Sequence, residues 1–117
     1  MWPDSDSRRW NKPRGACDPA TLQKQGALGV RVYAMLDGSD EELVRAELAN
    51  GPTVSSDGML AVRAVKLYAD GALGSRGAWL SSPYDDEPGS RGLQVTPEAQ
   101  LEDSVRRAAS AGFQPSV

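Results

Sequence analysis

The sequence has no histidine among its 117 residues and only one cysteine, Cys17. Without histidine, neither a Ser-His-Asp nor a Cys-His catalytic arrangement can form within the chain, and Cys17 has no histidine to activate it. Hydrolytic zinc sites commonly use two or three histidine ligands, so the usual donors for such a site are also missing. A lone cysteine cannot form an internal disulfide, and this usage is typical of a reducing cytosol.

Long apolar runs and dense positive charge are absent as well. No apolar stretch approaches the roughly 20 residues that span a bilayer, and residues 1–15 lack the apolar centre of a secretory signal. The sequence therefore predicts a soluble, cytoplasmic protein without a membrane segment. The net charge is −3, and Arg8-Arg9 and Arg106-Arg107 are the densest basic spots. Because nucleic-acid binding requires a concentrated basic face, we expect no nucleic-acid partner.

Turn-forming residues are abundant, with 12 glycines and 8 prolines, which predicts long connections. Residues 1–20 are polar, and Trp2 and Trp10 are their only large apolar side chains. Such a stretch has little to bury, so it is expected to be a flexible arm. The rest of the chain, residues 21–117, is expected to form one α/β unit that opens with a short helix at residues 21–27.

Two runs have the composition of β-strands, Val30–Leu36 and Met59–Tyr68, because they are rich in β-branched and aromatic residues. The segment between them, Ser39–Ala49, is predicted to be a helix. Ser39 and Glu42 can form a capping box at its start, and Asn50-Gly51-Pro52 terminates it. A strand, a helix and a second strand in this order predict two parallel neighbouring strands.

The C-terminal part begins with a Gly-, Ser- and Pro-rich connection over residues 70–95. Loops of this length in compact domains are usually functional or disordered. A second clear helix is predicted to start with Thr96 at its N-cap, and a third strand is expected from Phe113. The apolar stripe of that helix comprises Leu101, Val105, Ala108 and Ala109.

Lys66 lies near the carboxyl end of the second predicted strand, where ligand sites of parallel α/β proteins collect. A lysine in that place could be a general base, a Schiff-base former or a carboxylated metal ligand. The alternative is a structural lysine that pairs with Asp70 or extends its ammonium group into solvent.

The loop from Asp70 to Gly77, DGALGSRG, could bring its backbone close to an anion, and Arg76 could bind a carboxylate or phosphate. It lacks the Gly-Lys-Ser/Thr ending of a P-loop, which disfavours phosphate. Asp85-Asp86-Glu87 could bind a hard cation, but it lacks the alternating ligand spacing of a calcium loop. That spacing favours a solvated turn.

Three segments together resemble amidohydrolase family 3, whose members include N-substituted formamide deformylases: RVYAMLDGSDEEL, VRAVKLYADGALGSRGAWLSSPYDDEPGSRGL and TPEAQLEDSVRRAASAGFQ. The resemblance covers residues 22–114, and VKLYADGALGSRGA is its most specific part. It implies a (β/α)8 barrel in which a divalent metal activates water to hydrolyse an amide C–N bond of a small molecule, and zinc is the metal expected in the family's full-length members. It also implies that Lys66 is a carboxylated lysine that binds metal, and that Asp70 and Arg76 lie in a loop at the substrate site.

The sequence departs from the family in lacking its HxH pair, its later histidines and an HAIGD-like motif after Gln114. A complete barrel takes about 250 residues. We therefore expect a partial barrel segment with parallel strands, two clear helices and one long loop, which neither holds metal nor turns over substrate alone. Its unpaired strand edges are expected to favour self-association. The alternative is a non-catalytic binding or assembly module that docks through those edges and the Trp-bearing arm.

Overall fold

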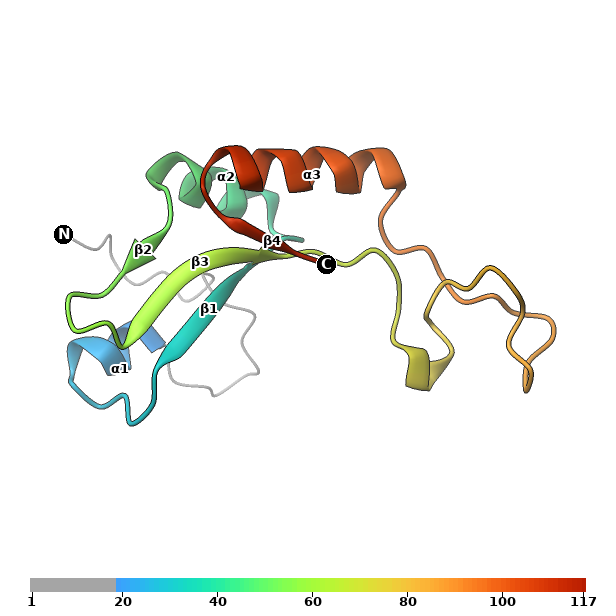
Figure 1. Cartoon of the computed structure of the whole chain (residues 1–117), viewed down its shortest axis with the longest axis horizontal. Helices are drawn as coiled ribbons and strands as arrows, with labels where there is room; N and C mark the ends of the chain where they lie inside the picture. Colours follow the sequence, from blue (N-terminus) through green and yellow to red (C-terminus); the bar gives the residue numbers. More distant parts are fainter. Residues whose placement is uncertain (1–18) are drawn as a thin grey trace.

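The computed structural model describes residues 19–117, and the predicted arm with Trp2, Trp10 and Cys17 lies outside this part. The described elements, in chain order, are α1 (Pro19–Lys24), β1 (Val32–Asp37), α2 (Glu41–Asn50), β2 (Thr53–Val54), β3 (Leu60–Lys66), the short 3-10 helix η1 (Leu73–Ser75), α3 (Glu98–Ser110) and β4 (Gln114–Ser116) (Figure 1). Within residues 19–117, no helix has both the length and the apolar character needed to cross a bilayer.

The sheet is built around β3. Strand β1 pairs in parallel with one edge of β3, while β4, also parallel, and the antiparallel β2 share its other edge. The predicted parallel pairing of the first two strands is therefore confirmed, and so is a third strand near the C-terminal end. Strand β2 was not predicted, because two residues are too few to produce a pattern. The result is a mixed α/β fold with a parallel and antiparallel sheet.

Strand β3 contains a β-bulge at Arg63. Ala34 of β1 is opposite Val62, whereas the next residue of β1 is opposite Ala64. On the other edge, β2 pairs with β3 up to Val62 and β4 pairs from Ala64 onward. Arg63 is thus the extra residue on both edges. The bulge places Val62 and Val65 on the same face, where each is 1% exposed, although regular alternation would place them on opposite faces.

One face of the sheet carries the hydrophobic core. Helices α2 and α3 lie together on that side of the strands in Figure 1. Leu36 is fully buried there, and Val44 of α2 and Phe113 after α3 join it in the same cluster. The opposite face is open, since Tyr33 and Met35 of β1 are 52% and 44% exposed. The residues of β1 therefore alternate between core and open face, as successive residues of a strand do.

The start of α2 differs from the prediction. Asp40 is the N-cap, and its Oδ1 accepts a hydrogen bond from the backbone N–H of Leu43 at 3.0 Å. The hydroxyl of Ser39 instead donates to Oδ1 of Asp37 at 2.7 Å. The capping box at Ser39 was therefore wrong by one residue. The helix ends at Asn50, one residue later than predicted, and Gly51 follows it with a φ of 78°, as expected of the glycine that terminates it.

The start of α3 also differs. Thr96 does not cap this helix, because its hydroxyl donates to the backbone oxygen of Tyr68 at 2.6 Å, and Pro97 takes the N-cap position without a side-chain bond. Ala109 is exposed, so it is not part of the stripe that buries Ala108. Strand β1 begins two residues later than predicted, since Val30 precedes it and is 69% exposed.

Candidate functional site

Lys66 is the last residue of β3, at the edge of the sheet where β1 and β4 also end. Its partners in register are Asp37 of β1 and Ser116 of β4. Residues that are opposite each other in neighbouring strands point to the same face, so Lys66 and Asp37 share the open face of the sheet. The predicted position of Lys66 at a strand end is therefore what the structure has.

The surroundings of Lys66 are aromatic rather than acidic. Its Nζ lies 5.0 Å from the centroid of the Tyr68 ring, which is within the range of cation–π attraction. The ion pair with Asp70 that was one alternative does not form. Asp37, the nearest carboxylate in register, accepts hydrogen bonds from the backbone N–H and the hydroxyl of Ser39.

A polar contact crosses the open face between its outer strands. The hydroxyl of Tyr33 in β1 donates to Oε1 of Gln114 in β4 at 3.0 Å. The two residues come from opposite sides of β3, so their side chains reach over it. Neither residue was singled out from the sequence. Alternation along a strand places Tyr33 on the face opposite Ala34 and Leu36, but its partner could not be inferred from one strand.

Asp70 lies in the loop that follows β3. Its Oδ2 accepts a hydrogen bond from the backbone N–H of Trp79 at 2.9 Å, and its backbone forms an antiparallel bridge with Gln94. Both contacts join Asp70 to other parts of the same loop. The carboxylate that the sequence assigned to the substrate site therefore holds the two arms of the loop together in this structure.

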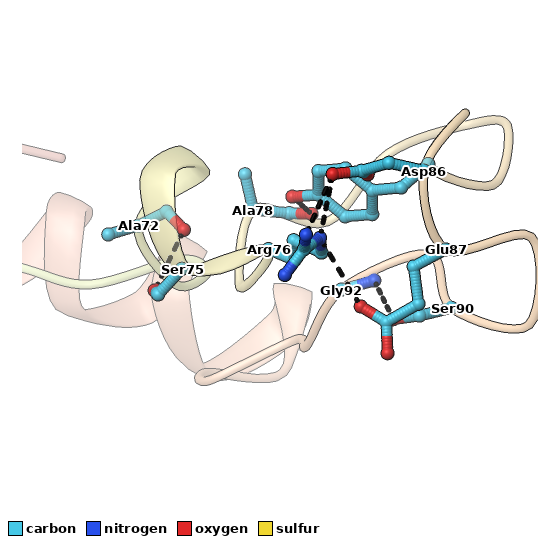
Figure 2. A network of polar contacts seen from close by, with 9 residues as sticks. Ala72, Ser75, Arg76, Ala78, Asp86, Glu87, Ser90 and Gly92 are labelled. Atoms are coloured by element: carbon cyan, nitrogen blue, oxygen red, sulfur yellow. Dashed lines mark hydrogen bonds and ion pairs between the residues drawn. The ribbon is translucent and has the colours of Figure 1, made fainter.

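Arg76 is paired within the loop as well. Its Nε and Nη2 donate to Oδ2 of Asp86 at 3.0 and 2.8 Å, and Oε2 of Glu87 lies 3.6 Å from Nε, as Figure 2 shows. The hydrogen bond lowers the pKa of Asp86 and raises the pKa of Arg76. Arg76 also has a φ of 56°, which is uncommon for a residue other than glycine. The acidic cluster thus neutralises Arg76.

The long loop is ordered by bonds between its own backbone groups, and in Figure 1 it extends away from the sheet beyond β3. The carbonyl oxygen of Gly77 accepts from the N–H groups of Gly71 and Leu93, both at 3.0 Å. Gly92 has a φ of 86°, and a Cβ there would overlap the backbone oxygen of Ala78. The loop is therefore ordered, and the disorder that was one of the two expectations for a loop of this length is not observed.

A pocket of about 270 Å³ lies beside this loop, between the segments after β1 and β3 and helix α3. Its lining is largely polar and includes Gly38, Ser39, Tyr68, Thr96, Gln100 and Ser104. Lys66, Asp70 and Arg76 are not among the lining residues. This pocket therefore does not bring the three predicted site residues together.

The donor set does not fit a complete catalytic metal centre. The chain has no histidine. Across residues 19–117, no three His, Cys, Asp or Glu side chains cluster closely enough to hold an ion. Lys66 is the one residue that the sequence assigned to the metal, and the two residues assigned to the substrate loop are bonded elsewhere, Asp70 to Trp79 and Arg76 to Asp86. Within this chain, Lys66 could supply one ligand at most.

Comparison with known proteins connects this arrangement to hydrolases. A Bacillus subtilis (strain 168) protein named "Putative amidohydrolase YtcJ" is 43% identical over 54 residues, which are 46% of this chain and 10% of that protein. An uncharacterized metal-dependent hydrolase from Pyrococcus furiosus is 31% identical with a TM-score of 0.70, over 82% of this chain and 20% of that one. Its counterpart from Pyrococcus horikoshii OT3 is 30% identical with a TM-score of 0.71, over 82% and 19%.

These relatives are much longer than the matched region, so the chain spans about a tenth to a fifth of their length. The model of the amidohydrolase family matches residues 19–117, which are all of the residues that the structure describes. The segments that carried the sequence resemblance lie within that range. The chain belongs to the amidohydrolase family.

Proposed function

We propose that the chain is a segment of a metal-dependent amidohydrolase barrel, in which Lys66 and the loop over residues 70–95 form one wall of the active site. The supporting observation is the arrangement of β1, β3 and β4, which are parallel, follow one another in chain order across the sheet and are connected by helices. This is the repeating unit of a (β/α)8 barrel. In such barrels the active site lies at the carboxyl ends of the strands, where Lys66 is.

The proposed reaction is hydrolysis of a non-peptide amide C–N bond in a small molecule, with N-substituted formamides as the substrate class. The structural neighbours described as metal-dependent hydrolases support the need for a divalent metal. Zinc is the proposed metal, and when bound it would lower the pKa of a water molecule so that hydroxide is available at neutral pH. The formamide class depends on the sequence resemblance alone.

The proposed roles of the three residues differ in kind. Lys66, as a carboxylated lysine, would bind the metal. Asp70 and Arg76 would shape the loop that faces the substrate, since both already bond within it. No catalytic acid or base is assigned in this chain. Because the chain has no histidine, the other metal ligands would come from barrel strands outside it.

Elemental analysis tests whether the chain alone lacks a complete centre. The purified chain is equilibrated with zinc, dialysed and analysed, and it is then assayed against a panel of amides that includes N-substituted formamides. We expect well under one zinc per chain and no hydrolysis. Tight binding of one or more zinc ions together with hydrolysis that a chelator abolishes would refute the proposal that the chain needs further ligands.

The role of Lys66 requires the rest of a barrel. Residues 32–116 can replace the matching segment of the Pyrococcus furiosus hydrolase, which shares 31% identity with this chain. We expect the chimera to bind metal, and K66A in that chimera to reduce the bound metal. R63A is the matched control on the same strand, because Arg63 lies outside the pairing on both edges. Equal metal content in K66A and R63A would show that Lys66 is not a ligand.

A further inference from the structure

The guanidinium group of Arg76 is held by a single carboxylate oxygen. Its Nε and Nη2 both donate to Oδ2 of Asp86, at 3.0 and 2.8 Å. A carboxylate binds arginine most strongly when each of its two oxygens accepts from a different nitrogen. Asp86 does not bind in this way, and Oε2 of Glu87 lies 3.6 Å from Nε, too far for a hydrogen bond. A carboxylate that is free to turn would therefore fit Arg76 better than Asp86 does.

The backbone of Arg76 is in the left-handed region, with a φ of 56° and a ψ of 27°. Within residues 19–117 it is the one residue other than glycine with a positive φ. Glycine adopts this conformation without strain, and other residues keep it chiefly at functional sites. The pair with Asp86 does little to offset the strain, because both side chains are largely exposed and such pairs add little stability. The side chain of Arg76 therefore needs another role.

The base of the loop fixes where Arg76 is presented. The backbone N–H groups of Val95 and Thr96 both donate to the oxygen of Ala69, at 2.9 and 3.3 Å. Ala69 follows closely on Lys66, so these bonds close the loop at the end of β3, and Figure 1 shows the loop extending beyond that end. The bonds lie within the chain itself, so they do not depend on neighbouring strands of a barrel.

We propose that Arg76 binds a carboxylate group of the substrate, and that Asp86 occupies this position until the substrate displaces it. The inference rests on the proposed function, because it names an acidic group on the same amide substrate. Both oxygens of the substrate carboxylate accept from Nε and Nη2, and the displaced Asp86 turns into solvent. A carboxylate replaces Asp86 charge for charge. A phosphate would bring additional negative charge beside Glu87, so carboxylate is the favoured group.

Binding to the full chain tests the role of Arg76 without metal or hydrolysis. The probes are N-formylglycine, a formamide with a carboxylate, and N-formylglycinamide, its neutral counterpart, titrated at constant ionic strength. The backbone amide signal of Gly77, next to Arg76, reports binding by NMR. We expect a saturable shift with N-formylglycine alone, which R76Q abolishes. R91Q is the matched control, because Arg91 is an exposed arginine of the same loop, and it should leave the shift unchanged.

Removal of Asp86 tests the displacement. An exposed ion pair contributes up to about 1 kcal/mol, which corresponds to about a fivefold change in a dissociation constant. D86N should therefore lower the dissociation constant of N-formylglycine by about twofold to fivefold, and D86N/E87Q should do so if Glu87 takes the vacated position. D85N removes the same charge from an exposed neighbour that does not bond to Arg76, so it should have a smaller effect.

The chimera described above separates this inference from the proposed function. K66A tests the metal there, whereas R76Q should raise KM for the acidic amide about tenfold and leave the metal content and the KM for the neutral amide unchanged. The carboxylate role is overturned if the full chain binds both probes equally or neither, or if R76Q and R91Q have the same effect. The displacement is overturned if neither D86N nor D86N/E87Q lowers the dissociation constant more than D85N does.

Discussion

Deletion of Arg63 is the most direct test of how β3 is built. Because this residue lies outside the pairing on both edges, its removal should turn the bulge into a regular strand. Ala34 would stay opposite Val62, and Ala64 would keep its partners in β1 and β4. We therefore expect the deletion to change the free energy of unfolding by less than about 1 kcal/mol, the range of substitutions away from the core.

The opposite hypothesis predicts a much larger effect. If β3 paired as a regular strand, deletion at residue 63 would move Leu60 and Val62 from the core to the open face. Each is 1% exposed, and moving a side chain of this size to solvent costs about 1.5–3 kcal/mol. The two together amount to about 3–6 kcal/mol, a large part of the roughly 6–18 kcal/mol expected for a folded chain of 117 residues.

Deletion of Ala64 is the matched control. It also removes one residue and the bulge, but it places Arg63 at the position of Ala64, which is 1% exposed. Burial of an unpaired guanidinium costs several kcal/mol, so this variant should unfold at much lower urea concentration. Urea unfolding followed by circular dichroism at one protein concentration gives both values. If the two deletions destabilise the chain equally, the proposed role of Arg63 is refuted.

Three further substitutions test the loop, a turn and a helix cap. G92A should expose the loop to limited proteolysis while the circular dichroism of the sheet persists, because its φ of 86° and a nearby carbonyl oxygen leave no room for a Cβ. The pKa of Asp57 lies below the ordinary 3.8, chiefly because the Ser55 hydroxyl donates a hydrogen bond to its carboxylate. The ionised carboxylate therefore stabilises the folded chain fully above the pKa that Asp57 has in the unfolded chain. This stabilisation is lost as the pH falls through the lower pKa of the folded chain. In D57N, the urea concentration at the midpoint of unfolding should therefore fall less steeply as the pH is lowered than it does in the unchanged chain. D40A should cost about 1 kcal/mol in urea unfolding, as loss of an N-cap does, whereas S39A should cost less.

The strands and the parallel order could be predicted because their causes are local. The run that contains β1 includes the β-branched and aromatic residues Val30, Val32 and Tyr33, and Gly51 ends α2 with the positive φ that glycine favours. The bulge could not be predicted, because it depends on where β1, β2 and β4 meet β3. In the sequence, Arg63 only interrupts an apolar run. The choice between Ser39 and Asp40 as N-cap likewise depended on Asp37, which binds the Ser39 hydroxyl.

The candidate site was predictable only in part. Lys66 could be placed at the end of a strand, because the apolar run ends there. The partner of Arg76 could not be found, since Asp86 lies ten residues further along a loop whose path depends on backbone bonds between its two arms. Strands and helices can be recognised by the spacing of their apolar residues, but an irregular loop of this kind has no such repeating pattern in its sequence.

The pairing of Arg76 with Asp86 does not remove Arg76 from the proposed substrate site. The two side chains are 48% and 65% exposed, and ion pairs between exposed side chains contribute little to stability. The shape of the loop depends instead on backbone groups, chiefly the Gly77 oxygen that binds Gly71 and Leu93. A substrate group with the same charge as Asp86 could therefore take its place at Arg76 without opening the loop. Lys66 differs from Arg76 in this respect, because it can act as the proposed metal ligand only where further ligands hold the same metal.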